Sequence, residues 1–134
     1  MISKLPGIVV LGGHIQALGI IRSIGKRDIP VHLVQSEIVS ISMFSKYVKR
    51  THLSPNEFNE RQYLDFLKQI SINESLQNFL LFPTNDQQVT TISKNRNFLS
   101  KYYKLSIPKW NTTKKIINKK YTYKIAEMLG INQP

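Results

Sequence analysis

The chain has 134 residues and a hydrophobic content of 41%, which suits one folded domain with a buried core. It contains no cysteine, which excludes disulfide bonds and thiolate metal sites. The formal net charge of +11 is concentrated at one end, since residues 93–134 hold ten lysines and arginines against one acid, Glu127. The apolar runs are too short to span a bilayer and no signal peptide is recognisable, so we expect a cytoplasmic protein that does not enter membranes.

The first third of the chain alternates strand and helix signals. Residues 8–11 form a continuous β-branched and leucine run that stops at a double glycine, which predicts a buried strand. Apolar residues three apart across residues 15–26 predict a helix, within which Gly19 suggests a close approach of the helix to the sheet. Residues 31–34 and 48–53 predict the second and third strands.

The same alternation continues to the end of the chain. A helix is predicted within residues 54–72, with Glu57 and Glu60 near its positive N-terminal end. Residues 78–83 predict a buried fourth strand and residues 84–103 a helix. Residues 106–110 read as extended, 112–130 as one or two short helices, and 131–134 as extended again. The last helix has an apolar face, which we expect to fold back, to pair with a second copy in a homodimer, or to be mobile.

This order predicts an α/β fold: a three-layer α/β/α, Rossmann-like domain with a parallel sheet of at least four strands in the order 3-2-1-4. Ligands of such sheets bind beyond the carboxyl ends of the strands. Two loops are expected there, one with Gly12, Gly13 and His14, the other with Thr84, Asn85 and Asp86. The glycines also suit a sharp turn, and Asp86 also suits a helix cap, so both a structural and a ligand role stay open.

Other functional classes are less well supported by the residues. A dinucleotide-binding turn needs G-x-G-x-x-G, but His14 stands at the second glycine position and only Glu37 could contact a ribose. The basic C-terminal segment could bind nucleic acid, although its lysines also suit a solvated face. The histidines lack metal-ligand spacing, and no nucleophile or carboxylate pair is evident, so we predict no catalytic residue and no metal site.

Four segments of the chain form a combination that spans nearly its whole length: "VVLGGHIQALGIIRSIGKRDIPVHLV", "SKYVKR", "LLFPTNDQQV" and "NKKYTYKIAEMLGINQP". In this order and spacing they resemble the start of ATP-grasp enzymes. The chain is most similar to carboxylate–amine ligases related to D-aspartate ligase and to the carbamoyl phosphate synthase large subunit. The resemblance implies a pre-ATP-grasp domain at residues 1–111 and, at residues 112–134, the start of the linker helix into an ATP-grasp domain.

The resemblance also implies a function and its residues. Lys119 matches the family lysine that contacts ATP, with Lys120 as the alternative register, because Asn118 and Asn132 depart from the family's acid and proline. The parent enzyme would use ATP and Mg²⁺ to join a small carboxylate to an amine through an acyl phosphate. Its ATP-grasp domain would be the partner of this one, and residues 1–134 alone are expected to be inactive.

Overall fold

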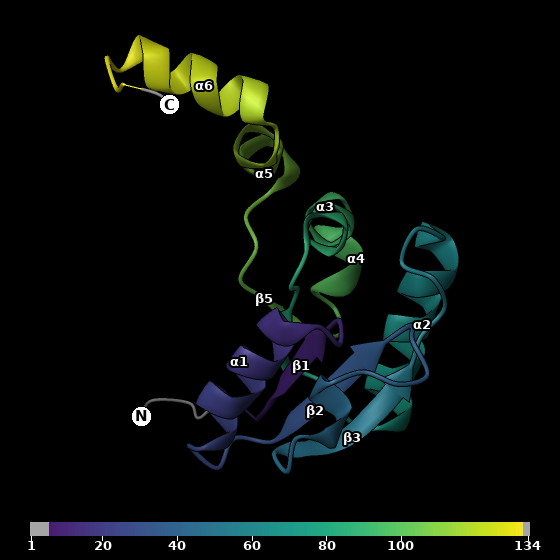
Figure 1. Cartoon of the computed structure of the whole chain (residues 1–134). Helices are drawn as coiled ribbons and strands as arrows, with labels where there is room; N and C mark the ends of the chain where they lie inside the picture. Colours follow the sequence, from purple (N-terminus) through teal and green to yellow (C-terminus); the bar gives the residue numbers. More distant parts are fainter. Residues whose placement is uncertain (1–5, 133–134) are drawn as a thin grey trace, which may run out of the picture.

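The computed structural model describes residues 6–132, and its centre is an all-parallel sheet of five strands in the order β3-β2-β1-β4-β5 (Figure 1). The strands are β1 (Ile8–Leu11), β2 (Val31–Gln35), β3 (Val48–Leu53), β4 (Leu80–Phe82) and β5 (Lys104–Leu105). The predicted α/β class and the order 3-2-1-4 are confirmed, and β5 extends the sheet beyond the strands that were predicted.

Helices cover both faces of this sheet. They are α1 (Ile15–Gly25), the 3₁₀ helix η1 (Ser42–Phe44), α2 (Glu60–Asn73), α3 (Asp86–Lys94), α4 (Arg96–Leu99), α5 (Trp110–Ile117) and α6 (Lys119–Met128). No helix in residues 6–132 combines the length and the apolar character that a membrane span requires.

The alternation of side chains along β1 divides the core into two layers. Val9 and Leu11 join the cluster that contains residues of α2, α3 and α4, such as Leu67. Ile8 and Val10 point the other way and join the cluster with α1. All four β1 residues are at most 3% exposed, as expected for a strand that is covered on both faces. The three-layer α/β/α architecture is therefore confirmed.

The C-terminal helices extend away from the sheet (Figure 1). Helix α5 packs against α3, where Thr113 is buried and the Lys94 ammonium lies 4.7 Å from the centre of the Trp110 ring. Helix α6 packs against α5 and has no buried residue. Its last residue, Met128, and the following Leu129 are both exposed. The expected boundary after residue 111 falls within the first turn of α5. The extended segment expected at residues 131–134 lies partly outside the described residues.

One expectation about helix α1 is wrong. Gly19 does not mark a close approach of the helix to the sheet, because a Cβ atom built there meets nothing within 4 Å. The tight contact of this helix is at Gly25, where a Cβ atom would clash with the side chain of Tyr47, the residue before β3. Helical periodicity alone could not distinguish the two, because each glycine falls inside the same amphipathic segment.

Candidate functional site

A cavity of about 180 Å³ lies beyond the carboxyl ends of the sheet strands. Each of the loops that follow β1 to β4 contributes to its lining, for example through Gly13, Glu37, Glu57 and Asn85. Parallel strands bring these four loops to one edge of the sheet although they are far apart in the sequence. This cavity is the candidate functional site.

The double glycine after β1 is required by the backbone and by close packing. Gly12 has φ +94, in the left-handed region that favours glycine, and its Cβ would lie 2.6 Å from Thr84 Oγ1. A Cβ on Gly13 would lie 2.5 Å from the Ser40 side chain. Both glycines also line the cavity. Both glycines therefore have a structural role. Because they also line the cavity, their backbone atoms would lie beside a ligand bound there.

The second predicted loop divides into lining and supporting residues. Asn85 lines the cavity and caps α3, since its Oδ1 accepts a hydrogen bond of 2.9 Å from the Gln88 N–H. Thr84 does not line it: its hydroxyl donates to the Leu11 carbonyl oxygen at 2.5 Å and so ties β4 to β1. Asp86 is exposed in the first turn of α3 and is not in the lining, so Asn85 is the cap for which Asp86 also seemed suited.

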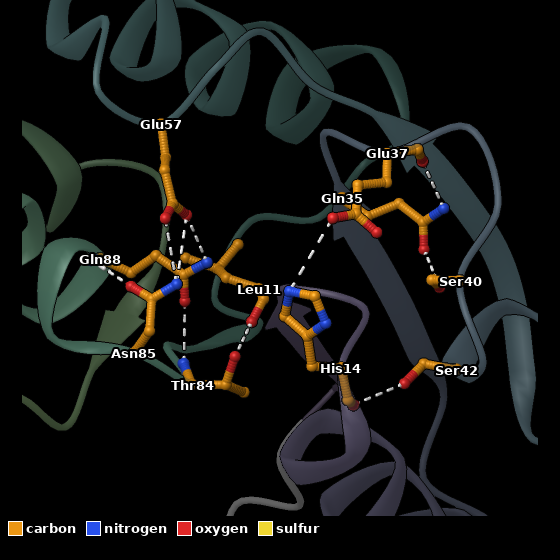
Figure 2. A network of polar contacts seen from close by, with 10 residues as sticks. All are labelled: Leu11, His14, Gln35, Glu37, Ser40, Ser42, Glu57, Thr84, Asn85 and Gln88. Atoms are coloured by element: carbon orange, nitrogen blue, oxygen red, sulfur yellow. Dashed lines mark hydrogen bonds and ion pairs between the residues drawn. The ribbon is translucent and has the colours of Figure 1, made fainter.

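Glu57 is the centre of a polar network that the sequence did not indicate (Figure 2). Its carboxylate accepts hydrogen bonds from Asn85 Nδ2 at 3.1 Å and from Gln88 Nε2 at 2.8 Å. Gln88 is 2% exposed, and its Oε1 accepts a hydrogen bond of 2.9 Å from the Thr84 N–H. The two amides therefore hold Glu57 in place without neutralising its charge.

The opposite side of the site is formed by the loops after β1 and β2 (Figure 2). His14 Nε2 lies 4.0 Å from Glu37 Oε1, and both side chains are largely exposed. The Ser42 hydroxyl donates to the His14 carbonyl oxygen at 3.0 Å. Gln35 Nε2 donates to the Glu37 carbonyl oxygen at 2.6 Å. These contacts fix the loop backbones and leave the His14 ring at the rim.

The two candidate ATP-contacting lysines lie outside this cavity. Lys119 and Lys120 are the first residues of α6, both are exposed, and neither is among the lining residues. Asn118 caps this helix, with its Oδ1 accepting a hydrogen bond of 3.0 Å from the Lys120 N–H. The structure therefore does not bring the lysines together with the predicted substrate-side loops. In residues 6–132, no group of three or more His, Asp or Glu residues is arranged to hold a metal ion.

A pair of buried histidines lies within the sheet, away from the cavity lining. The rings of His32 on β2 and His52 on β3 are stacked, and His32 Nδ1 lies 2.9 Å from His52 Nε2. Burial, together with the nearby His52, lowers the pKa of His32 to about 4. Burial also holds the pKa of His52 below its ordinary value. The pair is therefore neutral in the folded protein near pH 7.

This pair should make the protein less stable in mild acid. Between pH 6.5 and about 4 the unfolded chain binds protons that the folded His32 excludes, so the free energy of unfolding should fall as the pH falls. For each such proton, the free energy of unfolding changes by about 1.4 kcal/mol per pH unit. Urea unfolding at pH 7 and pH 5 measures this slope. His52→Gln should reduce it, whereas replacing the exposed His14 with glutamine should not; an equal slope in both variants would contradict the assignment.

Comparisons with known proteins agree with the fold. No protein-family model and no curated protein matches the sequence. Among solved structures, the chain is similar to the L-amino acid ligase from Bacillus licheniformis, with a TM-score of 0.71 and 16% sequence identity. The match covers 98% of this chain and 32% of the ligase, so the chain spans about a third of the ligase's length and shares its fold over that third.

Proposed function

We propose that this chain is the substrate-side N-terminal domain of an ATP-grasp ligase, which joins a carboxylate to an amine through an acyl phosphate. The observation that carries the proposal is the fold match to an L-amino acid ligase, which includes nearly all of this chain and only a third of the ligase. The segments that resemble carboxylate–amine ligases support it independently. The remaining part of the enzyme would be the partner domain.

The cavity supports a substrate role rather than a nucleotide role. Its lining includes Glu37 and Glu57 and no lysine or arginine, so it does not suit the phosphates of ATP or of a dinucleotide. The described residues also offer no metal-binding group that suits Mg²⁺. In this proposal the partner domain binds ATP and Mg²⁺, and Lys119 or Lys120 contributes a charge at the boundary.

Two measurements test this function. Sequencing the gene beyond the codon for Pro134 should reveal an ATP-grasp region. Calorimetry on the 134-residue chain should show only weak ATP binding that does not depend on Mg²⁺, because residues 6–132 offer no group of acidic side chains that could bridge phosphates through magnesium. Tight, Mg²⁺-dependent binding to this chain would contradict the proposal.

Nucleic-acid binding by the basic C-terminal segment, residues 93–134, is the second candidate function. Its lysines on α5 and α6 are mostly exposed, which suits contact with phosphates as well as with water. Fluorescence anisotropy with random DNA and RNA across a salt series separates the two functions. Tight binding at physiological salt with a steep salt dependence would favour the rival, and the ligase domain should show neither.

A further inference from the structure

The candidate cavity is acidic in a strongly basic protein. The chain has a formal net charge of +11, yet the lining contains two glutamates, Glu37 and Glu57, and no lysine or arginine. Glu57 makes hydrogen bonds to the neutral amides of Asn85 and Gln88, and neither amide cancels its charge. The field inside the cavity therefore favours a cation, whereas the rest of the surface favours anions.

A second, independent observation concerns Tyr63, which also lines the cavity. This side chain is 2% exposed, and within residues 6–132 its hydroxyl makes no hydrogen bond. Tyr103 is buried to a similar degree, but its hydroxyl donates to the Leu67 carbonyl oxygen at 2.6 Å. Since no fully buried side-chain oxygen in the described residues lacks a partner, the Tyr63 oxygen is not completely buried, and Tyr63 is one of the residues that line the cavity.

The Tyr63 hydroxyl is held neutral in this position. Burial raises its pKa, and the nearby carboxylate of Glu57 raises it further. No protein group of the described residues occupies this hydroxyl, so it is available to a ligand in the cavity. Its oxygen can accept a hydrogen bond as well as donate one.

We propose that the cavity binds a small primary ammonium group, with the Glu57 carboxylate and the Tyr63 hydroxyl oxygen as its acceptors. A primary ammonium carries three N–H donors and a positive charge, which match one carboxylate and one neutral oxygen. A phosphate or a carboxylate would be repelled by Glu57. A neutral alcohol would satisfy Tyr63 but leave the charge of Glu57 uncompensated.

The inference names a substrate class for the ligase, and in that respect it rests on the proposed function. An amine that stays protonated has no lone pair for attack on an acyl phosphate. The substrate held by Glu57 would therefore be recognised by its amino group and would react through another group. An amino acid that is activated at its carboxylate, or a diamine that reacts at its second nitrogen, has this chemistry.

The test uses three probes that share one skeleton and differ in charge: L-alaninamide as the cation, N-acetyl-L-alaninamide as the neutral compound, and N-acetyl-L-alanine as the anion. Titration of the ¹⁵N-labelled 134-residue chain, followed by NMR, should shift the amide signals of Gly12 and Gly13 with L-alaninamide alone. Equal responses to the cation and the neutral compound, or no response to the cation, would overturn the proposal.

Variants locate the binding determinants. Glu57→Gln should weaken L-alaninamide binding roughly tenfold or more, the usual effect of losing a charge-assisted hydrogen bond. Tyr63→Phe should weaken L-alaninamide binding by a smaller factor while the chain stays folded. This variant still tests the site if Glu57→Gln disturbs the structure. Glu60→Gln is the matched control, because Glu60 also accepts a hydrogen bond from an asparagine amide, that of Asn95, but does not line the cavity.

The outcomes distinguish this inference from the ligase function. Equal weakening by Glu60→Gln and Glu57→Gln would overturn the ammonium site. The titration involves neither ATP nor acyl transfer, so a failure of the ligase function leaves the binding result intact. Conversely, the complete enzyme could form acyl phosphates although its cavity does not bind L-alaninamide. That result would support the ligase function and overturn the ammonium site.

Discussion

Lys119→Ala in the complete ligase that we propose is expected to lower kcat/KM for acyl phosphate formation roughly hundredfold, the usual effect of removing one charge-stabilising group. A lysine beside transferring phosphate acts in a cleft with little water, where its charge is weakly screened. Lys115→Ala should change the rate by less than about twofold, because this lysine is exposed on α5 and solvated charges contribute little. ADP release in the presence of the carboxylate measures both.

The structure makes Lys120 the informative third variant. Asn118 caps α6, so Lys119 and Lys120 are consecutive residues of the first helical turn. Consecutive residues of a helix point about 100° apart, so one lysine at most can be directed at a given phosphate. If Lys120→Ala loses most of its activity while Lys119→Ala stays active, Lys120 is the residue that matches the family's ATP-contacting lysine. Full activity in all three variants would show that the terminal lysines form only a solvated face.

The central strands could be predicted from the sequence because burial on both faces leaves a direct signature. The β1 segment is four apolar residues long, and all four are buried in one of the two core layers. Such a run has no polar face and cannot be confused with a surface helix. The expected bounds of residues 8–11 and 48–53 agree with β1 and β3 as observed.

The short edge strand and one helix start could not be predicted in the same way. Strand β5 has two residues, Lys104 and Leu105, and pairs with β4 at the sheet edge. Two residues are too few to form a periodic pattern that would predict a strand. Helix α2 begins at Glu60 rather than near residue 54, because Asn59 caps it by accepting a hydrogen bond from the Gln62 N–H. The spacing of Asn59 and Gln62 resembles a capping box and was the available signal.

That misplaced helix start is the reason that Glu57 was missed. Within a helix, Glu57 suited the positive N-terminal end, a role that involves no ligand. In the loop after β3, the same side chain extends to α3 and accepts hydrogen bonds from Asn85 and Gln88. Contacts between residues about thirty positions apart depend on the sheet order, which places the loops after β3 and β4 on one cavity. Local patterns carry no such information.

Gly12→Ala is expected to destabilise the protein by about 3 kcal/mol, the sum of two independent effects. The first is backbone strain, because φ at this residue is +94. The second is steric, because the new methyl group would lie 2.6 Å from Thr84 Oγ1, which is held by its hydrogen bond to the Leu11 carbonyl oxygen. Most small domains have 5–15 kcal/mol of stability, so the loss should be clear in urea unfolding.

Two further variants separate these effects. Gly19→Ala places the same methyl group where a Cβ meets nothing within 4 Å, and at this exposed helix position it should stabilise the protein by about 1 kcal/mol. Thr84→Ala removes the atom that Gly12→Ala would strike, so the double variant should lose less stability than the two single losses combined. Additive losses would mean that the loop after β4 moves aside. In that case the requirement for glycine at position 12 would come from the backbone conformation alone. The close contact between Gly12 and Thr84 would then not fix the positions of the loops around the cavity.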